Sequence, residues 1–178
     1  MEEKVMDAQG RSSWVGTAIL LPAIITLGLC TRAGAQGKAC SLATPDELQA
    51  ALGAKVSGLK SQSMPGGGAE LCIGQTPTAS VMMRLAKRSD QGQGKGKEAA
   101  GIEMAKKMGA QVEVKTDGPI TCSTMIPPKG LEQYGFNTTC SVLKNGQVAA
   151  IEVTAKSQKD MVAMDSLHKI AEKMAGRF

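Results

Sequence analysis

Aromatic residues are scarce in this 178-residue chain, which contains one Trp, one Tyr and two Phe. Proteins that hold single-stranded nucleic acid stack its bases on aromatic side chains. The scarcity therefore argues against nucleic acid as a partner. Hydrophobic residues nevertheless make up 42% of the chain. That share is close to the globular norm, so we expect a folded core rather than a disordered chain.

Histidine and the common catalytic motifs are equally sparse. The one histidine is His168, which leaves a His-rich metal site or a His-based catalytic triad without support. The nucleophile motif G-x-S-x-G is absent. The glycine- and lysine-rich segment 92–97 fits neither the P-loop pattern nor G-x-G-x-x-G. We therefore expect a protein that is not an enzyme and that carries no cofactor.

The N-terminal segment predicts export. Trp14 to Cys30 is a run of 17 residues without charge, which is short for a membrane span of about 20 residues but suits a signal peptide. Ala33-Gly34-Ala35 follows as a cleavage pattern. We predict a signal peptide at 1–35 and a periplasmic or secreted domain at 36–178. Two alternatives stay open, a lipid on Cys30 and an uncleaved anchor, and only these would hold the protein at a membrane.

The predicted mature domain is basic. It keeps the net charge of +5, because residues 1–35 contain three basic and three acidic residues. A basic exported domain could bind acidic polymers of the cell envelope or lipid headgroups. Ordinary solubility charge is the simpler interpretation, since no long basic run occurs.

Four cysteines remain after the predicted cleavage, and an even number in an exported chain predicts a disulfide framework. Three pairings are possible. We favour one in which each bond closes a moderate local loop. Zinc ribbons use cysteines two to four residues apart, and the sequence has no C-x-x-C, which argues against zinc and against a thioredoxin-type role. The favoured bonds are Cys40–Cys72 and Cys122–Cys140.

Hydrophobic periodicity and turn residues predict three helices and seven strands. The clearest signals are a capping box at Thr44 and Glu47 and an Asn145-Gly146 hairpin turn. Hairpins dominate, so we predict an α+β fold with a largely antiparallel sheet and helices packed on it. The expected helices are 45–52, 98–108 and one that starts near Ser157 or Asp160 and ends at Gly176. The expected strands are 55–59, 70–74, 80–86, 111–115, 119–126, 136–143 and 147–155.

The same region carries a family resemblance. It begins with Cys40-Ser41-Leu42, continues with Ala50-Ala51-Leu52-Gly53, has a second cysteine at Cys72 and closes with an apolar helix. This resembles small bacterial envelope proteins, mostly actinobacterial lipoproteins of unassigned function. It is also similar in outline to the extracellular sensor domains of mycobacterial serine/threonine kinases. The resemblance implies an α/β/α sandwich like the PsbP/Mog1-type fold and supplies no catalytic residues. Leu29, directly before Cys30, departs from the lipoprotein pattern.

Two loops are candidate binding surfaces, because loops on a rigid sheet often carry binding residues. The first contains Lys95 and Lys97, where the start of the expected second helix could hold an anion. The second runs from Pro127 to Tyr134 and contributes Lys129 and Tyr134. Our leading hypothesis is a non-enzymatic envelope domain that binds a ligand or a protein partner. The sequence does not identify that partner or the oligomeric state.

Methionine supports an alternative function, since thioethers are soft ligands for Cu(I). Met161, Met164 and His168 fall within two turns of the expected last helix, which would make the protein a periplasmic copper binder. Methionine also fills cores that lack aromatic residues. On that interpretation, the sides of the expected helices that face the core contain Met104, Met108, Met161, Met164 and Met174.

Overall fold

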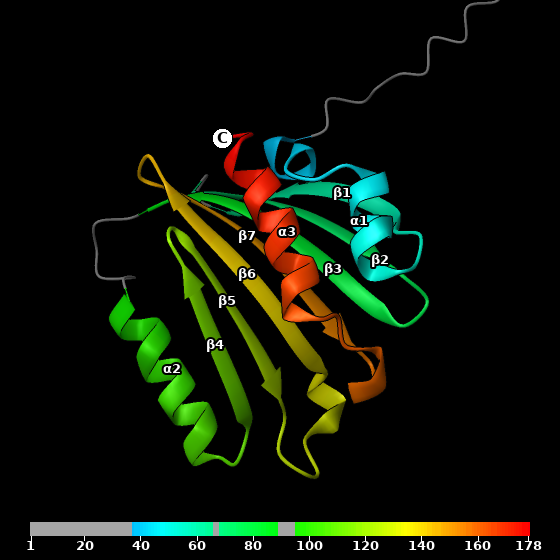
Figure 1. The fold of residues 1–178 in the computed structure, drawn as a ribbon. Coiled ribbons are helices and arrows are strands. Elements are labelled where there is room, and N and C mark those ends of the chain that lie inside the picture. The colour runs from blue at the N-terminus through cyan, green and yellow to red at the C-terminus, as the bar shows by residue number, and fades with distance from the viewer. Residues whose placement is uncertain (1–36, 66–67, 89–94) are drawn as a thin grey trace, which may run out of the picture. The chain divides into compact units, whose positions relative to one another are not determined.

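A computed structural model describes residues 37–65, 68–88 and 95–178. The predicted signal peptide, its cleavage site, Cys30 and most of the glycine-rich connection lie outside the described residues. Within them, the strands form a seven-stranded antiparallel sheet in the order β1-β2-β3-β7-β6-β5-β4 (Figure 1). The strands are β1 (Ser57–Ser63), β2 (Ala69–Gln75), β3 (Ala79–Lys87), β4 (Gln111–Asp117), β5 (Ile120–Ile126), β6 (Phe136–Lys144) and β7 (Gln147–Ala155).

The helices cover the two faces of the sheet unequally. Helix α3 (Met164–Ala175) crosses β5, β6 and β7, while α1 (Pro45–Leu52) packs against α3. The 3-10 helix η1 (Lys38–Ser41) lies against β1, β2 and β3. These elements share the face turned toward the viewer in Figure 1 and enclose the core. Its largest fully buried side chains include Leu42, Leu48, Met83, Ile151, Leu167 and Met174.

The opposite face has much less cover. Helix α2 (Lys95–Lys107) contacts β4 at the edge of the sheet. The fold class predicted from the sequence is confirmed. None of the helices in the described part of the chain is both long and apolar enough to cross a membrane.

Helix α1 begins as its sequence predicts. The Glu47 amide donates to Thr44 Oγ1 and the Thr44 amide donates to Glu47 Oε2, at 3.3 and 2.9 Å. Gly53 ends the helix at a φ of +67°, which glycine adopts without the penalty of a Cβ. The β6–β7 turn is also as predicted, since Asn145 and Gly146 both have positive φ, at 51° and 70°.

An ion pair joins α1 to the C-terminal end of the chain. Arg177 donates from Nη1 and Nη2 to the two carboxylate oxygens of Glu47, each at 2.7 Å, and from Nη1 to the Leu42 carbonyl at 2.8 Å. Lys173 adds a contact of 3.4 Å to Glu47. Hydrogen bonding by Arg177 is the largest influence on Glu47 and lowers its pKa from 4.5 to about 2, although burial opposes the shift. The start and end of the domain are thereby held together.

Both disulfides have the pairing favoured from the sequence. Cys40–Cys72 links η1 to β2, and Cys122–Cys140 joins residues that face each other across β5 and β6. All four cysteines are buried. The first bond ties the N-terminal segment to the sheet, whereas the second joins strands that are already paired.

Several predicted boundaries are wrong. Strand β1 covers 57–63 rather than 55–59, so it extends further toward β2 than expected. Helix α3 begins at Met164, because Ser157 and Asp160 hydrogen-bond to each other around a separate 3-10 helix, η3 (Gln158–Asp160). Helix α2 covers 95–107 instead of 98–108. Met104 and Met108 were expected in the core, but they are 63% and 61% exposed, because α2 lies at the thinly covered edge.

Candidate functional site

Two hollows open on the surface of the described residues. The first, which we call the Tyr134 hollow, has a volume of about 360 Å³ and lies where β2 ends, β3 begins and β7 ends. The 3-10 helix η2 (Glu132–Tyr134) closes it from the β5–β6 connection. Its walls are Gln75, Thr76, Ala79, Ser80, Glu132, Gln133, Tyr134, Gly135, Thr154, Ala155 and Lys156.

Tyr134 is the exposed aromatic residue of this hollow, with 70% of its surface accessible. Its position depends on Gly135, which has a φ of +83° and is buried. A Cβ at Gly135 would lie 2.4 Å from Thr154 Cγ2 and 3.2 Å from the Ala155 carbonyl oxygen. Only glycine therefore lets the chain turn from Tyr134 into β6 this close to β7.

The charged groups of the Tyr134 hollow are already engaged. Lys156 Nζ donates to the Pro77 carbonyl at 3.1 Å, and the Gly130 amide donates to Glu132 Oε2 at 2.8 Å. The remaining polar side chains are amides and hydroxyls, which both donate and accept hydrogen bonds. Uncharged polar groups therefore dominate the lining, which suits a ligand that itself carries uncharged polar groups.

The sequence-predicted binding residues fall into two places. Lys129 and Tyr134 belong to the same connection between β5 and β6, and Lys129 is exposed. Lys95 and Lys97 lie in the first turn of α2. The turn after that helix is next to the β5–β6 connection, since a Cβ on Gly109 would be 3.5 Å from Pro128 Cβ. Lys95 and Lys97 thus lie at one end of a helix about 20 Å long, and the connection that carries Lys129 and Tyr134 lies near its other end.

The second hollow, which we call the α2 hollow, lies between α2 and the thinly covered face of the sheet. Its volume is about 330 Å³. The apolar side comes from α2, β4 and β5, and the polar side from β5, β6 and β7. The lining residues are Gly101, Ile102, Ala105, Val112, Ser123, Met125, Asn137, Thr139 and Glu152.

Two acceptors in the α2 hollow are incompletely paired. Asn137 Oδ1 is buried and has no hydrogen-bond donor among the described residues. Glu152 is half-buried on the central strand β7 and accepts one bond of 3.4 Å from the Thr154 hydroxyl. Within the described part of the chain, no ion pair involves Glu152. A buried acceptor without a donor is costly, so Asn137 Oδ1 favours a donor from outside the chain, and Glu152 can accept further bonds beside it.

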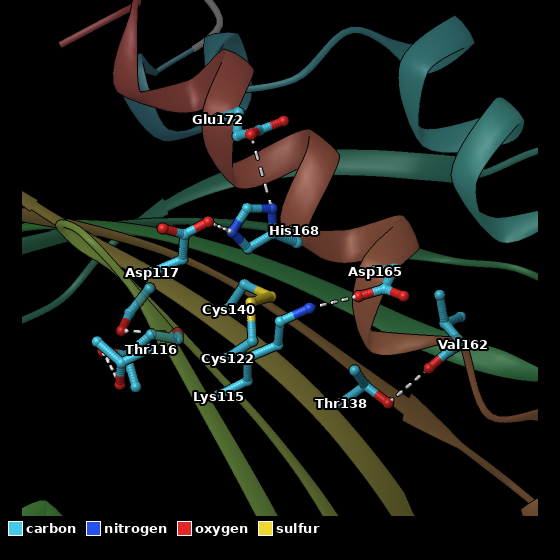
Figure 2. The surroundings of a disulfide bond; sticks show 12 residues. Lys115, Thr116, Asp117, Cys122, Thr138, Cys140, Val162, Asp165, His168 and Glu172 are labelled. Atoms are coloured by element: carbon cyan, nitrogen blue, oxygen red, sulfur yellow. Dashed lines mark hydrogen bonds and ion pairs between the residues drawn. A yellow bond between two sulfur atoms is a disulfide. The ribbon is translucent and has the colours of Figure 1, made fainter.

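His168 lies in a cluster of charged residues on the other face of the sheet. Figure 2 shows its ring between two carboxylates, with Nε2 3.7 Å from Asp117 Oδ2 and Nδ1 3.7 Å from Glu172 Oε1. Lys115 Nζ lies 3.1 Å from Asp165 Oδ1 beside them. The hydrogen bond from Lys115 lowers the pKa of Asp165. This cluster joins β4 and its end to α3, above the Cys122–Cys140 bond.

The predicted copper ligands are in different surroundings. Met161 precedes α3 instead of lying on it, because the helix begins at Met164. Both methionines pack against the core, whereas His168 faces Asp117 and Glu172. No group of three or more His, Cys, Asp or Glu side chains in the described residues has the arrangement of a metal site.

Sequence reasoning missed the polar lining of the α2 hollow. Asn137, Thr139 and Glu152 alternate with buried residues along β6 and β7, so they look like the solvated side of half-buried strands. The signal was present, because two neighbouring central strands both carry polar residues on the same face. Only the placement of α2 over that face turns them into a hollow.

No protein-family model and no curated protein sequence matches the chain. Two chains of solved structures match it. One is the extracellular domain of PknH from Mycobacterium tuberculosis, which is 12% identical, with a TM-score of 0.47 over 80% of this chain and 95% of that one. The expected likeness to an extracellular domain of a mycobacterial kinase is thus found at low similarity. The PsbP/Mog1-like fold and the lipoprotein family stay predictions.

Proposed function

We propose that this chain is an exported, non-enzymatic domain of the cell envelope that binds a ligand or protein partner at the Tyr134 hollow. One observation carries the binding site, namely an exposed tyrosine that borders a hollow of about 360 Å³. Tyrosine is enriched in the centres of interfaces, because its ring supplies contact area and its hydroxyl a hydrogen bond.

Export is supported by the cysteine chemistry. Disulfides persist in oxidising compartments and are rare in the reducing cytosol. Cys40–Cys72 and Cys122–Cys140 account for all four cysteines after the predicted cleavage site. The apolar run from Trp14 to Cys30 supplies the export signal in this proposal, and cleavage after Ala35 leaves Gln36 as the first residue.

In this proposal, close packing and paired strands hold the walls of the Tyr134 hollow in place. Gly135 and Thr154 pack tightly behind the tyrosine, and the walls belong to the ends of three paired strands. Because Lys156 and Glu132 are engaged with the backbone, Gln75, Ser80 and Gln133 supply the free polar groups. The ligand is therefore an uncharged polar segment or molecule that stacks on Tyr134, with Lys129 at the edge of the contact.

The test compares Tyr134→Ala with Leu131→Ala. Leu131 lies in the same connection and is 37% exposed, but it does not line the hollow. Each oxidised protein would be immobilised and exposed to a solubilised envelope extract of the source cells. Components retained by the wild type should be retained by Leu131→Ala and lost with Tyr134→Ala. If all three proteins retain the same set, the proposed site is wrong.

A further inference from the structure

Among the described residues, the α2 hollow has two features that the Tyr134 hollow lacks, a buried acceptor without a donor and a wall of apolar side chains. Beside them lies Glu152, a carboxylate without an ion pair in this part of the chain. The α2 hollow adjoins the Tyr134 hollow, since Thr154 of that hollow donates to Glu152, but the two hollows share no lining residue. We propose that it binds a primary ammonium group carried on a short hydrocarbon chain, and this inference does not depend on the proposed function.

The strand register brings the polar groups together. Thr139 faces Glu152 across the β6–β7 pair, and Asn137 faces Thr154. Asn137, Thr139 and Glu152 therefore share one face of two adjacent strands, with Thr139 directly opposite Glu152 and Asn137 diagonal to it. All three line the same hollow.

The number and type of these groups match an ammonium. An –NH₃⁺ group has three donors and no acceptor. Glu152, the buried Oδ1 of Asn137 and the Thr139 hydroxyl can each accept one of them. Arg84 lies on the neighbouring strand, since Met82 pairs with Glu152 and Arg84 with Ala150, but no ion pair joins Arg84 to Glu152.

The apolar wall determines which kind of molecule can present the ammonium group. Ile102 and Ala105 of α2 face Val112 and Met125 of the sheet edge across the hollow. Burial of methylene groups is favourable by about 0.8 kcal/mol each. A short alkyl chain, either of a free amine or of a lysine side chain, can therefore contact this wall while its ammonium meets the three acceptors.

The test follows amide chemical shifts of the full domain, with both disulfides formed, during titration with n-pentylammonium at neutral pH. We expect saturable shifts near Ser123, Asn137 and Glu152. 1-Pentanol has the same hydrocarbon chain without the charge and should bind much more weakly. A parallel titration with Nα-acetyl-lysine amide shows whether the hollow also accepts a lysine side chain or only a free amine.

Two variants decide the outcome. Glu152→Gln should weaken binding by about tenfold or more, as expected for the loss of a hydrogen bond to a charged group. The matched control Glu113→Gln removes an exposed carboxylate of β4 that does not line the hollow, and it should leave the affinity unchanged.

Ala105→Leu fills the hollow from the α2 side, leaves all three acceptors in place and should abolish binding. It decides the question if Glu152→Gln fails to fold. The proposal is overturned if pentanol binds as tightly as the amine, if neither variant weakens binding, or if the amine gives no saturable shifts.

Discussion

Glu47 performs two structural tasks with one carboxylate. Its Oε2 closes the capping box at the start of α1 and also accepts from Arg177, 130 residues later in the chain. The sequence predicts the first task, because Thr44 and Glu47 have the spacing of a capping box. It cannot predict the second, since Arg177 carries no local signal for its partner.

The lowered pKa of Glu47 predicts a dependence of stability on pH. A carboxyl with a folded pKa of about 2 against an ordinary value of 4.5 stabilises the fold above pH 4.5, and the contribution is lost as the pH falls through 2. We expect Glu47→Gln to lower the free energy of unfolding by about 1 kcal/mol at pH 7. Urea titrations should show a clearly smaller difference between the two proteins at pH 2 than at pH 7, because the carboxyl is about half protonated when the pH equals its folded pKa.

Asp46→Asn is the control for that measurement. Asp46 is the neighbouring exposed carboxylate in the same first turn, and it forms no ion pair among the described residues. Its substitution should have a smaller effect. Equal losses for the two variants would show that general charge near the start of α1 matters, and not the contact with Arg177.

Residues that could bind a ligand were only partly predictable. Tyr134 stood out in the sequence because aromatic residues are rare. Glu152 did not, because a single charged residue in an alternating strand normally points to solvent. Its surroundings depend on the placement of α2 over the face of the sheet that carries Glu152, which no local pattern encodes.

At the scale of elements, the predicted helix boundaries are correct where one set of capping residues is present. They are wrong where several residues near the helix start could serve as the cap. Helix α1 has a cap, a proline at its first position and a glycine after its end, and its predicted range is correct. Helix α3 begins at Met164, and its N-cap residue, Ala163, offers no side-chain cap. The better capping residues upstream, Ser157 and Asp160, are used by η3. The prediction followed the residues with capping chemistry, and so the helix start was wrong.

The two disulfides should protect different elements. Replacing Cys40 and Cys72 by alanine should lower the free energy of unfolding by about 3–4 kcal/mol and raise amide exchange in η1, because no β-pairing holds this segment to the sheet. Replacing Cys122 and Cys140 should cost a comparable amount without raising exchange in β5 and β6 more than in the other central strands, because the backbones of β5 and β6 remain paired. Hydrogen exchange followed by mass spectrometry measures both.

Helix η1 is the informative segment in that comparison. If its exchange were unchanged without Cys40–Cys72, packing of Ala39 and Leu42 would suffice to hold it. If β5 and β6 lost protection without Cys122–Cys140, backbone pairing would be insufficient there. Either result would contradict the assignment of separate roles.

For the whole molecule, the sequence predicted the class of the fold but not the order of its strands. Hairpin turns fix β2 beside β3, β4 beside β5 and β6 beside β7. The pairing of β3 with β7 joins residues as far apart as Ala79 and Ala155. It depends on burying both strands beneath η1 and α3, and this long-range packing has no signature in a local pattern.

Export gives a prediction about the molecule as a whole. Protein recovered from the source cells should begin at Gln36 and carry no free thiols, since the remaining four cysteines form two bonds. Intact-mass spectrometry with and without reduction reads both properties, and a lipid on Cys30 would appear as added mass. A full-length product with reduced cysteines would contradict the proposed export.

The two ends of the described domain lie together, since Arg177 bonds to the Leu42 carbonyl and Glu47. The β5–β6 connection with Tyr134 lies at the opposite end of the molecule (Figure 1). A partner bound at that connection would therefore not contact the residues where the described domain begins and ends.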